Sequence, residues 1–301
     1  MTNQKIVAPE GMQWIAGGEF LMGSDDFYPE ERPVREVQVE GFWLDIMPVT
    51  NLDFSLFIAE TGYITLAEQP PLAEEYPDVA AENLVAGSMV FQSPGKKVRP
   101  SHYSDWWSYI PGACWHRPDG VNSLTHEDAQ LPVVQIAFAD ALAYAHWAGK
   151  RLPLEAEWEF AACGGLQPSP YAWGADFMPE GKKMANTWQG PFPFAGDVAP
   201  GSYFSTSPVG AFPANPFGLH DMIGNVWEWT ADNWMPDHHP AQRSCCSSSK
   251  EMKRGYDEIR KVLKGGSHLC APNYCQRYRP AARQGQSVDG ATTHIGFRCA
   301  K

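Results

Sequence analysis

Two cysteines near the end of the sequence have the residue type and spacing most suited to chemistry. Cys270 and Cys275 lie five positions apart in the segment Lys264–Arg279, with a proline and an asparagine between them. This spacing across a turn can bring two sulfurs onto one soft metal ion or into one disulfide. Two inert thiols are the third alternative. We interpret the two cysteines as a reactive thiol pair.

The cellular compartment bears on the choice between these alternatives. The sequence has seven cysteines in no regular framework, and its first ten residues are polar, without a basic-then-apolar signal. No stretch reaches the roughly 18 apolar residues of a membrane span. These features predict a cytoplasmic protein with mostly reduced cysteines, which favours a catalytic or metal-binding pair over a structural disulfide.

The ligands of such a pair indicate which metal it would bind. Cys270 and Cys275 lack nearby ligating histidines at zinc spacing, and two thiolates alone make a poor zinc site. Linear coordination by two sulfurs suits Cu(I). We expect His268 at the surface or behind the ligands rather than on the metal.

The other cysteines are not expected to take part. Cys114 and Cys163 are predicted to be buried as small apolar residues. The vicinal pair Cys245–Cys246 lies in a polar loop and is interpreted as two free thiols. Cys299, near the C-terminus, has no obvious partner.

Two further segments carry oxygen donors beside glycines. In Gly218–Thr230, the turn Gly224–Asn225 and Glu228 offer the carbonyl and carboxylate oxygens that Ca²⁺ prefers. Similar donors recur in Asn186–Gly190, which Asp197 follows. From spacing alone we favour a structural turn between tryptophans for the first segment and an ordinary polar loop for the second.

Composition predicts a loop-rich globular protein. Of its 301 residues, 44% are hydrophobic and only 19% charged, with 27 glycines, 26 prolines and 12 tryptophans. Such a chain can bury a large core but does not suit a helix bundle or a disordered protein. The net charge of −12 opposes binding to nucleic acid or anionic membranes. No linker divides the chain, so we predict one domain over residues 1–301.

A few regular elements should position the thiol segment. Helices are expected from the N-cap Thr50 to Gly62, over 140–148 with Gly149 as its cap, and from Pro153 to Gly164. Strands are expected as a hairpin around Gly17–Gly18, and over 37–44, 133–136 and 293–299.

Two stretches are predicted to be irregular. Residues 25–35 should form a charged loop that leaves Glu30 and Glu31 in solvent. Residues 69–122 are rich in proline and aromatic side chains, and so long a loop either serves the function or wraps the core.

Seven distinctive segments run through the chain from end to end. They are GGEFLMGS (17–24), PVTN (48–51), WAGKRLPLEAEWEFA (147–161), NTWQG (186–190), GLHDMIGNVWEWT (218–230), KGGSHLCAPNYCQRYR (264–279) and GFRC (296–299). Together, and in this order, they resemble the formylglycine-generating enzymes, also called sulfatase-modifying factors. Several are shared with non-catalytic members and with iron-dependent sulfoxide synthases. The Cys270/Cys275 pair is the feature that marks the oxidase type.

The resemblance implies a fold, an activity and a set of site residues. The fold is a single compact α+β domain with low regular secondary structure, the formylglycine-generating-enzyme (C-type-lectin-like) fold. The activity is that of an oxidoreductase that uses O₂ and a single copper. It converts the cysteine of a Cys-x-Pro-x-Arg segment in an unfolded sulfatase to Cα-formylglycine. By resemblance, the Cu(I) ligands are Cys270 and Cys275, the lining residues are Ser267 and Trp229, the residue close behind is Arg277, and the groove residue is Tyr274.

The family's structural calcium sites map onto this chain by position. One falls on the carbonyls of Ile223, Gly224 and Val226 and on the carboxylate of Glu228. The other falls on Asn186, Thr187 and a carbonyl near Tyr203. The acid that completes this site in the family aligns with Gly201, so either Asp197 takes the place of that acid or the site is weak.

The sequence also departs from the family near the thiol pair and in its cysteines. Ala271 follows the first cysteine, where histidine is frequent. Ala145 and Pro280 occupy positions at which secretory members have disulfide cysteines, which fits a cytosolic bacterial-type enzyme. Cys245–Cys246 is an additional feature.

Two other functions stay as alternatives. A non-catalytic binding scaffold would not need both cysteines, and their presence counts against it. A non-haem iron oxidase of the sulfoxide-synthase type needs a histidine-rich facial site, and the nine histidines show no such cluster. For the copper oxidase we expect a monomer that uses neither nucleic acid nor a membrane.

Overall fold

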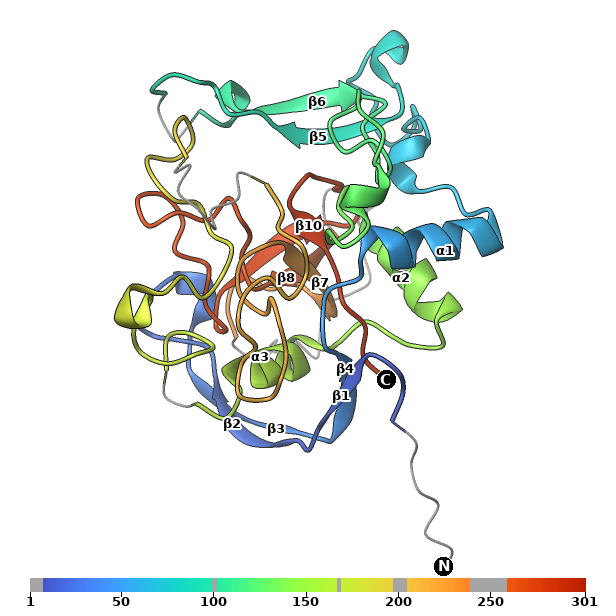
Figure 1. The fold of residues 1–301 in the computed structure, drawn as a ribbon. Coiled ribbons are helices and arrows are strands. Elements are labelled where there is room, and N and C mark those ends of the chain that lie inside the picture. Colours follow the sequence, from blue (N-terminus) through green and yellow to red (C-terminus); the bar gives the residue numbers. More distant parts are fainter. Residues whose placement is uncertain (1–7, 99–101, 167–168, 197–204, 239–258) are drawn as a thin grey trace, which may run out of the picture.

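The largest sheet has four strands in the order β10-β7-β8-β9, and its strand β8 leads into the thiol segment (Figure 1). The computed structural model describes residues 8–98, 102–166, 169–196, 205–238 and 259–301. Strands β7 (Trp227–Asn233), β8 (Arg260–Lys264) and β9 (Arg283–Ser287) are antiparallel neighbours, whereas β10 (Ile295–Gly296) runs parallel to β7. The strand predicted over 293–299 is therefore only two residues long.

The N-terminal strands form one antiparallel ribbon that is interrupted by a bend. β1 (Met12–Ile15) pairs with β4 (Phe42–Asp45), and β2 (Gly18–Met22) pairs with β3 (Arg35–Val39), in one continuous register. The predicted hairpin at Gly17 is wrong, and so is the single strand over 37–44. A Cβ on Gly17 would lie 2.4 Å from the Val39 carbonyl oxygen. This glycine therefore permits the close crossing of two backbone segments rather than a turn.

The stretch from 69 to 122 contains a sheet that the sequence did not reveal. Strands β5 (Gly87–Phe91) and β6 (Trp107–Pro111) pair in an antiparallel sheet at one end of the molecule (Figure 1). Their connection is too long for a recognisable hairpin turn, which explains why local patterns missed it.

Three helices follow local signals closely. α1 (Asn51–Thr61) begins after Thr50, whose hydroxyl accepts the backbone N–H of Asp53, and ends at Gly62 with φ of 67°. α3 (Glu155–Cys163) begins two residues after Pro153 and ends at Gly164. α2 (Phe138–Trp147) starts two residues earlier than predicted, and its C-cap is Ala148 rather than Gly149. Among the described residues, none of these helices has the length and apolar character needed to span a membrane.

The predicted strand over 133–136 is wrong. The N–H of Val133 donates to the Val49 carbonyl, but Gln135 has a φ of 62°, which breaks an extended conformation. Short 3₁₀ helices add turns elsewhere: η1 (Pro29–Glu31), η2 (Leu66–Glu68), η3 (Ala81–Asn83), η4 (Tyr103–Asp105), η5 (His126–Asp128) and η6 (Pro179–Gly181).

Two hydrophobic clusters form most of the core. One packs α1 and α2 against the four-stranded sheet and includes Cys270 and Cys275. The other surrounds Trp158 of α3, which lies between the four-stranded sheet and the β2–β3 sheet (Figure 1). As predicted, Cys114 and Cys163 are buried, and Cys299 is a buried free thiol.

Charged pairs are buried among these apolar side chains. Glu155 Oε1 lies 2.6 Å from Arg283 Nε, and Glu159 Oε2 lies 2.7 Å from Lys264 Nζ. Burial alone would raise the pKa of Glu155, but hydrogen bonding to His238 and the charges of Lys264 and Arg283 lower it to about 2. The Glu155 carboxylate therefore stays ionised at neutral pH and neutralises buried cationic side chains.

The expectation that Glu30 and Glu31 are solvated is wrong. Glu31 is completely buried, and its two oxygens accept hydrogen bonds from the Arg279 guanidinium. Because Arg279 lies only four residues after Cys275, this pair ties the N-terminal region to the candidate site.

Replacing Glu155 with glutamine should destabilise the protein by about 3 kcal/mol at pH 7. The folded-state pKa of Glu155 is depressed to about 2 from an ordinary value of 4.5, so its contribution is present above pH 4.5 and disappears as the pH falls through 2. Urea unfolding of the parent and E155Q at pH 7, 4 and 2 measures this. The control E36Q, on an exposed part of β3, should change little. A difference between the parent and E155Q that is the same at every pH would contradict the assignment.

Candidate active site

Cys270 and Cys275 lie at the two ends of a tight turn. The Cys270 N–H donates to the Ser267 carbonyl at 2.9 Å, and the Cys275 N–H donates to the Ala271 carbonyl at 2.8 Å. The two sulfurs are 3.5 Å apart, and both side chains are buried. The structure thus brings together the pair that the spacing predicted.

Two glycines let this turn fit against the sheet. Gly265 and Gly266 have φ values of 90° and 73°, a region that other residues rarely adopt. A Cβ on Gly265 would lie 2.8 Å from the Met222 carbonyl oxygen, and one on Gly266 would lie 2.5 Å from the Arg277 carbonyl oxygen. Both residues are therefore needed for the close approach of neighbouring backbone.

The distance between the sulfurs bears on their chemistry. It is far longer than the roughly 2.05 Å of a disulfide bond, and Cys270 and Cys275 are both free thiols. The 3.5 Å separation is shorter than the roughly 4.6 Å that two metal–sulfur bonds of about 2.3 Å can span, so one metal ion can reach both sulfurs. Two soft thiolates remain a suitable donor set for Cu(I).

The two thiols are electrostatically unequal. The hydrogen bond from Cys270 and the nearby Arg277 lower the pKa of Cys275 to about 6, although burial opposes this. The hydrogen bond to Cys275 and burial raise the pKa of Cys270 well above its usual value. At neutral pH the metal-free pair therefore shares one proton, with Cys275 as the thiolate and Cys270 as the donor.

Arg277 is held next to Cys275 by residues from the N-terminal region. Its Nη1 lies 3.8 Å from the Cys275 sulfur, and its Nε donates to Glu30 at 3.2 Å. The guanidinium also lies 4.0 Å above the centre of the Tyr28 ring. Sequence reasoning missed Glu30 and Tyr28, because the nearly 250 intervening residues leave no local signal for the contact.

A cavity of about 580 Å³ opens over the thiol pair. Ser267, Cys270 and Cys275 lie on its wall together with an aromatic surface. In that surface, the Phe192 and Tyr274 rings stack with centroids 4.6 Å apart, and Trp106 meets both of them edge-on. The cavity can therefore accept an extended apolar or proline-containing segment next to the sulfurs.

The predicted lining residues differ in their access to this cavity. Ser267 lies on the wall, and its N–H faces the Cys270 sulfur at 3.4 Å. Tyr274 is 36% exposed and lies at the cavity rim. Trp229 is fully buried in the core cluster that contains both cysteines, and its indole donates to the Ile136 carbonyl. Trp227, rather than Trp229, contributes to the wall.

The residues on either side of Cys270 are buried. His268 is not at the surface: its backbone N–H and its Nδ1 both lie 2.9 Å from the Asn225 carbonyl oxygen. Burial lowers the pKa of His268 to about 4, so the ring is neutral at physiological pH. Ala271 packs in the cluster that contains Trp106, Trp188 and Phe192.

The residues proposed for calcium that the structure describes lie in one buried region. The Asn225 N–H donates to the Asn186 carbonyl, so the two candidate segments are in direct contact. Within the described ranges, no hydrogen bond ends on the carbonyl oxygens of Ile223, Gly224 or Val226, which suits them to a hard cation. Glu228 already accepts hydrogen bonds from Trp158 and, through both oxygens, from Arg298. Asp197, Gly201, Tyr203 and Cys245–Cys246 lie outside the described residues.

This chain is similar to several known proteins over nearly its whole length. A model of the sulfatase-modifying factor enzyme 1-like domain matches residues 1–301. The formylglycine-generating enzyme of Mycobacterium tuberculosis is 53% identical over 287 residues, which cover 95% of each chain. A Mus musculus protein called inactive C-alpha-formylglycine-generating enzyme 2 is 39% identical over 294 residues, 96% of this chain and 85% of that protein. The solved structure of PvdO from Pseudomonas aeruginosa, 24% identical, has the same fold, with a TM-score of 0.63 over 96% of this chain and 93% of its own.

Alkylation of Cys275 in the metal-free protein should reach half its maximal rate near pH 6, well below the usual thiol value of 9. Both C270A and R277Q should move this midpoint upward, because each change removes a group that stabilises the thiolate. Mass spectrometry of the peptide that contains Cys275, after brief treatment with iodoacetamide at pH 4 to 10, gives the rate. A midpoint near 9 in the parent protein would show that the thiols do not share a proton in this way.

Proposed function

We propose that this chain, which belongs to the formylglycine-generating enzyme (sulfatase-modifying factor) family, is a copper-dependent oxidase that acts on a sulfatase polypeptide before it folds. The substrate is a cysteine in a Cys-x-Pro-x-Arg segment, and the product is Cα-formylglycine. The observation that carries the proposal is the buried pair of free thiols, 3.5 Å apart, on the wall of an aromatic-lined cavity.

The overall reaction balances with O₂ and an external thiol reductant. The substrate Cβ loses its C–S bond and one C–H bond and gains a C=O bond, and its sulfur is released as hydrogen sulfide. One oxygen atom enters the aldehyde and the other leaves as water. Two thiols of the reductant supply the remaining two electrons and become a disulfide. Copper bound by Cys270 and Cys275 would supply the one-electron chemistry that O₂ requires.

The residues of the chain prepare and protect this reaction. Arg277 stabilises the Cys275 thiolate, so that a soft cation meets a ligand already deprotonated at neutral pH. Both sulfurs are buried apart from the side that faces the cavity, so a substrate segment bound there would exclude water from them. The stacked rings of Phe192 and Tyr274 offer a surface for the proline of the substrate segment. Ser267 and Trp229 are proposed to help position the substrate cysteine at the sulfurs of Cys270 and Cys275.

A non-catalytic scaffold is the second candidate, because one relative of similar identity is called inactive. The thiol pair distinguishes the oxidase from the scaffold, since a scaffold has no need of a shared proton between buried cysteines. We place the reaction in the cytoplasm and the protein in a monomeric state. Both assignments rest on the sequence expectations given above.

Replacing Cys270 or Cys275 with alanine should lower aldehyde formation to about 1% of the parent rate or less, because each change removes half of the ligand pair. The assay combines protein, Cu(I), O₂, dithiothreitol and a Cys-x-Pro-x-Arg peptide, with the mass of the product as readout. C163A is the matched control, because Cys163 is equally buried but lies in the other core cluster. Full activity in both C270A and C275A, or no aldehyde from the parent with any such peptide, would reject the oxidase.

Calcium is proposed at the carbonyls of Ile223, Gly224 and Val226, with Glu228 shared between the ion and Arg298, and at a second site formed by Asn186, Thr187, Asp197 and Tyr203. Calcium at about 100 times its dissociation constant should stabilise the fold by about 3 kcal/mol, which raises the melting temperature by roughly 5 °C. Thermal unfolding of chelator-treated protein with and without Ca²⁺ tests this, with Mg²⁺ as the control. Identical melting temperatures would argue against both sites.

A further inference from the structure

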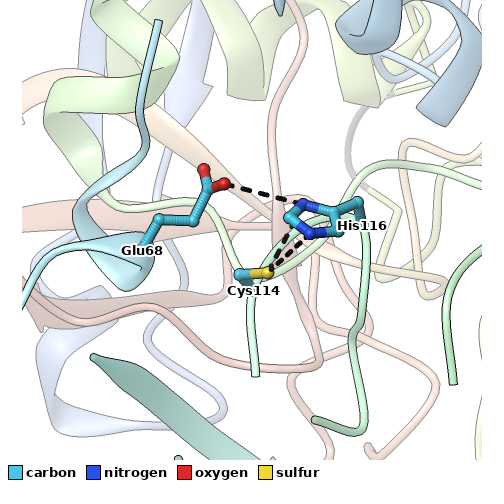
Figure 2. A group of neighbouring side chains, drawn as sticks. All are labelled: Glu68, Cys114 and His116. Atoms are coloured by element: carbon cyan, nitrogen blue, oxygen red, sulfur yellow. Dashed lines mark hydrogen bonds and ion pairs between the residues drawn. The ribbon is translucent and has the colours of Figure 1, made fainter. Parts of the chain in front are cut away.

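Three metal-ligating side chains meet outside the cavity that holds the thiol pair. Figure 2 shows Glu68 facing the imidazole of His116, with the Cys114 sulfur beneath the same ring. The sulfur lies 3.5 Å from His116 Nδ1, and Nδ1 lies 3.6 Å from Glu68 Oε1. None of the three residues lines the cavity above Cys270 and Cys275, so the cluster is separate from the proposed active site.

These distances match the edges of a zinc coordination shell. With bonds of about 2.3 Å to sulfur and about 2.0 Å to nitrogen or oxygen, tetrahedral ligands lie roughly 3.3 to 3.6 Å apart. All three ligand atoms lie within 4.8 Å of one another, so the remaining edge closes with a small shift of the part-exposed Glu68. The sulfur lies beneath the ring, 3.5 and 3.7 Å from its two nitrogens, so the imidazole must turn about its Cβ–Cγ bond to direct a nitrogen at a shared ion.

The surrounding residues hold the ligands in place. Glu68 Oε2 accepts hydrogen bonds from the backbone N–H and the hydroxyl of Thr65, which leaves Oε1 to face His116. Cys114 and Arg117 exchange backbone hydrogen bonds at 3.1 and 3.0 Å, which closes the turn that carries Cys114 and His116. Such outer contacts orient ligands in metal sites.

Accessibility differs among the ligands in a way that suits a bound ion. Cys114 is 2% exposed and packs against Ala67 and Ala291. The side chains of His116 and Glu68 are 37% and 25% exposed, so the open side of the cluster reaches solvent. A water molecule can therefore complete a tetrahedral shell from that side, as in zinc sites with three protein ligands.

We propose that Glu68, Cys114 and His116 bind one divalent metal ion of the zinc type. Glu68 comes from η2 and the other two ligands from the turn after β6. The ion would therefore join the two ends of the excursion, the segment between Glu68 and Cys114 that contains the β5–β6 sheet. That excursion also contributes Trp106 and Trp107 to the wall of the cavity. The ion would thus stabilise one side of the peptide groove without taking part in the oxidation. This proposal does not depend on the proposed function.

Cobalt(II) is the probe for the test, because a thiolate bound to Co²⁺ gives a charge-transfer absorption in the near ultraviolet. The parent and every single variant contain both Cys270 and Cys275. A difference between the cobalt spectra of the parent and of C114S therefore reports the Cys114 thiolate. C114S should lose one equivalent of this absorption. H116N and E68Q should bind Co²⁺ and Zn²⁺ at least about tenfold more weakly than the parent. C163S, which removes a buried thiol elsewhere, should match the parent.

Thermal unfolding gives an independent readout. Zn²⁺ should raise the melting temperature of the parent and of a C270A/C275A double variant, but not that of C114S or H116N. Metal-free melting temperatures of the variants show whether they still fold, and E68Q, which keeps an oxygen for Thr65, is the mildest change. Equal cobalt spectra for the parent and C114S, or equal zinc stabilisation of the parent, H116N and E68Q, would overturn the proposal.

Discussion

The buried Arg298 guanidinium joins three segments of this protein, at Asp45–Ile46, at His220 and at Glu228. All five of its N–H donors are used: three reach the carbonyl oxygens of Asp45, Ile46 and His220, and two reach the oxygens of Glu228. Trp158 of α3 donates to the same carboxylate. Breaking one partner of such a buried pair typically costs about 3 to 5 kcal/mol, because the other charge is left without compensation. The hydrogen bonds of this buried centre thus tie several loops of the fold to β7 and α3.

The position of the thiol pair follows from this centre. Glu228 belongs to β7, and the chain just before β7 presents the Asn225 carbonyl to both the backbone and the ring of His268. His268 lies two residues before Cys270, so the sulfurs are connected to the core by a short series of hydrogen bonds. From the opposite side, Glu30 and Glu31 hold Arg277 and Arg279. The unequal acidity of the two thiols depends on this second set of contacts.

The molecule uses different means to order its long irregular segments. In the core, buried ion pairs take the place of extended sheets and helices. At the periphery, the excursion between η2 and the turn at Cys114 has its two ends brought together at a cluster of three ligand side chains. The same excursion supplies aromatic side chains to the cavity, so the order of this segment and the shape of the groove are linked.

The sequence by itself determined the features that depend on neighbouring residues. Helices α1 and α3 could be predicted because Thr50, Pro153 and the two closing glycines act within one turn of the chain. The Cys-x4-Cys spacing likewise implied that two sulfurs meet, since a turn of that length is a local structure. The motifs that resemble the family also identified the fold and the oxidase chemistry.

Only the tertiary structure decided the features that join distant segments. Gly17 permits a crossing with β3 rather than a hairpin, and no local pattern distinguishes these two uses of a glycine. Glu30, which holds Arg277, and Glu68, which meets Cys114 and His116, lie far from these residues in sequence, so neither contact could be predicted. Charge and burial are set by the whole fold, and a carboxylate such as Glu31 looks solvated until its arginine is placed beside it.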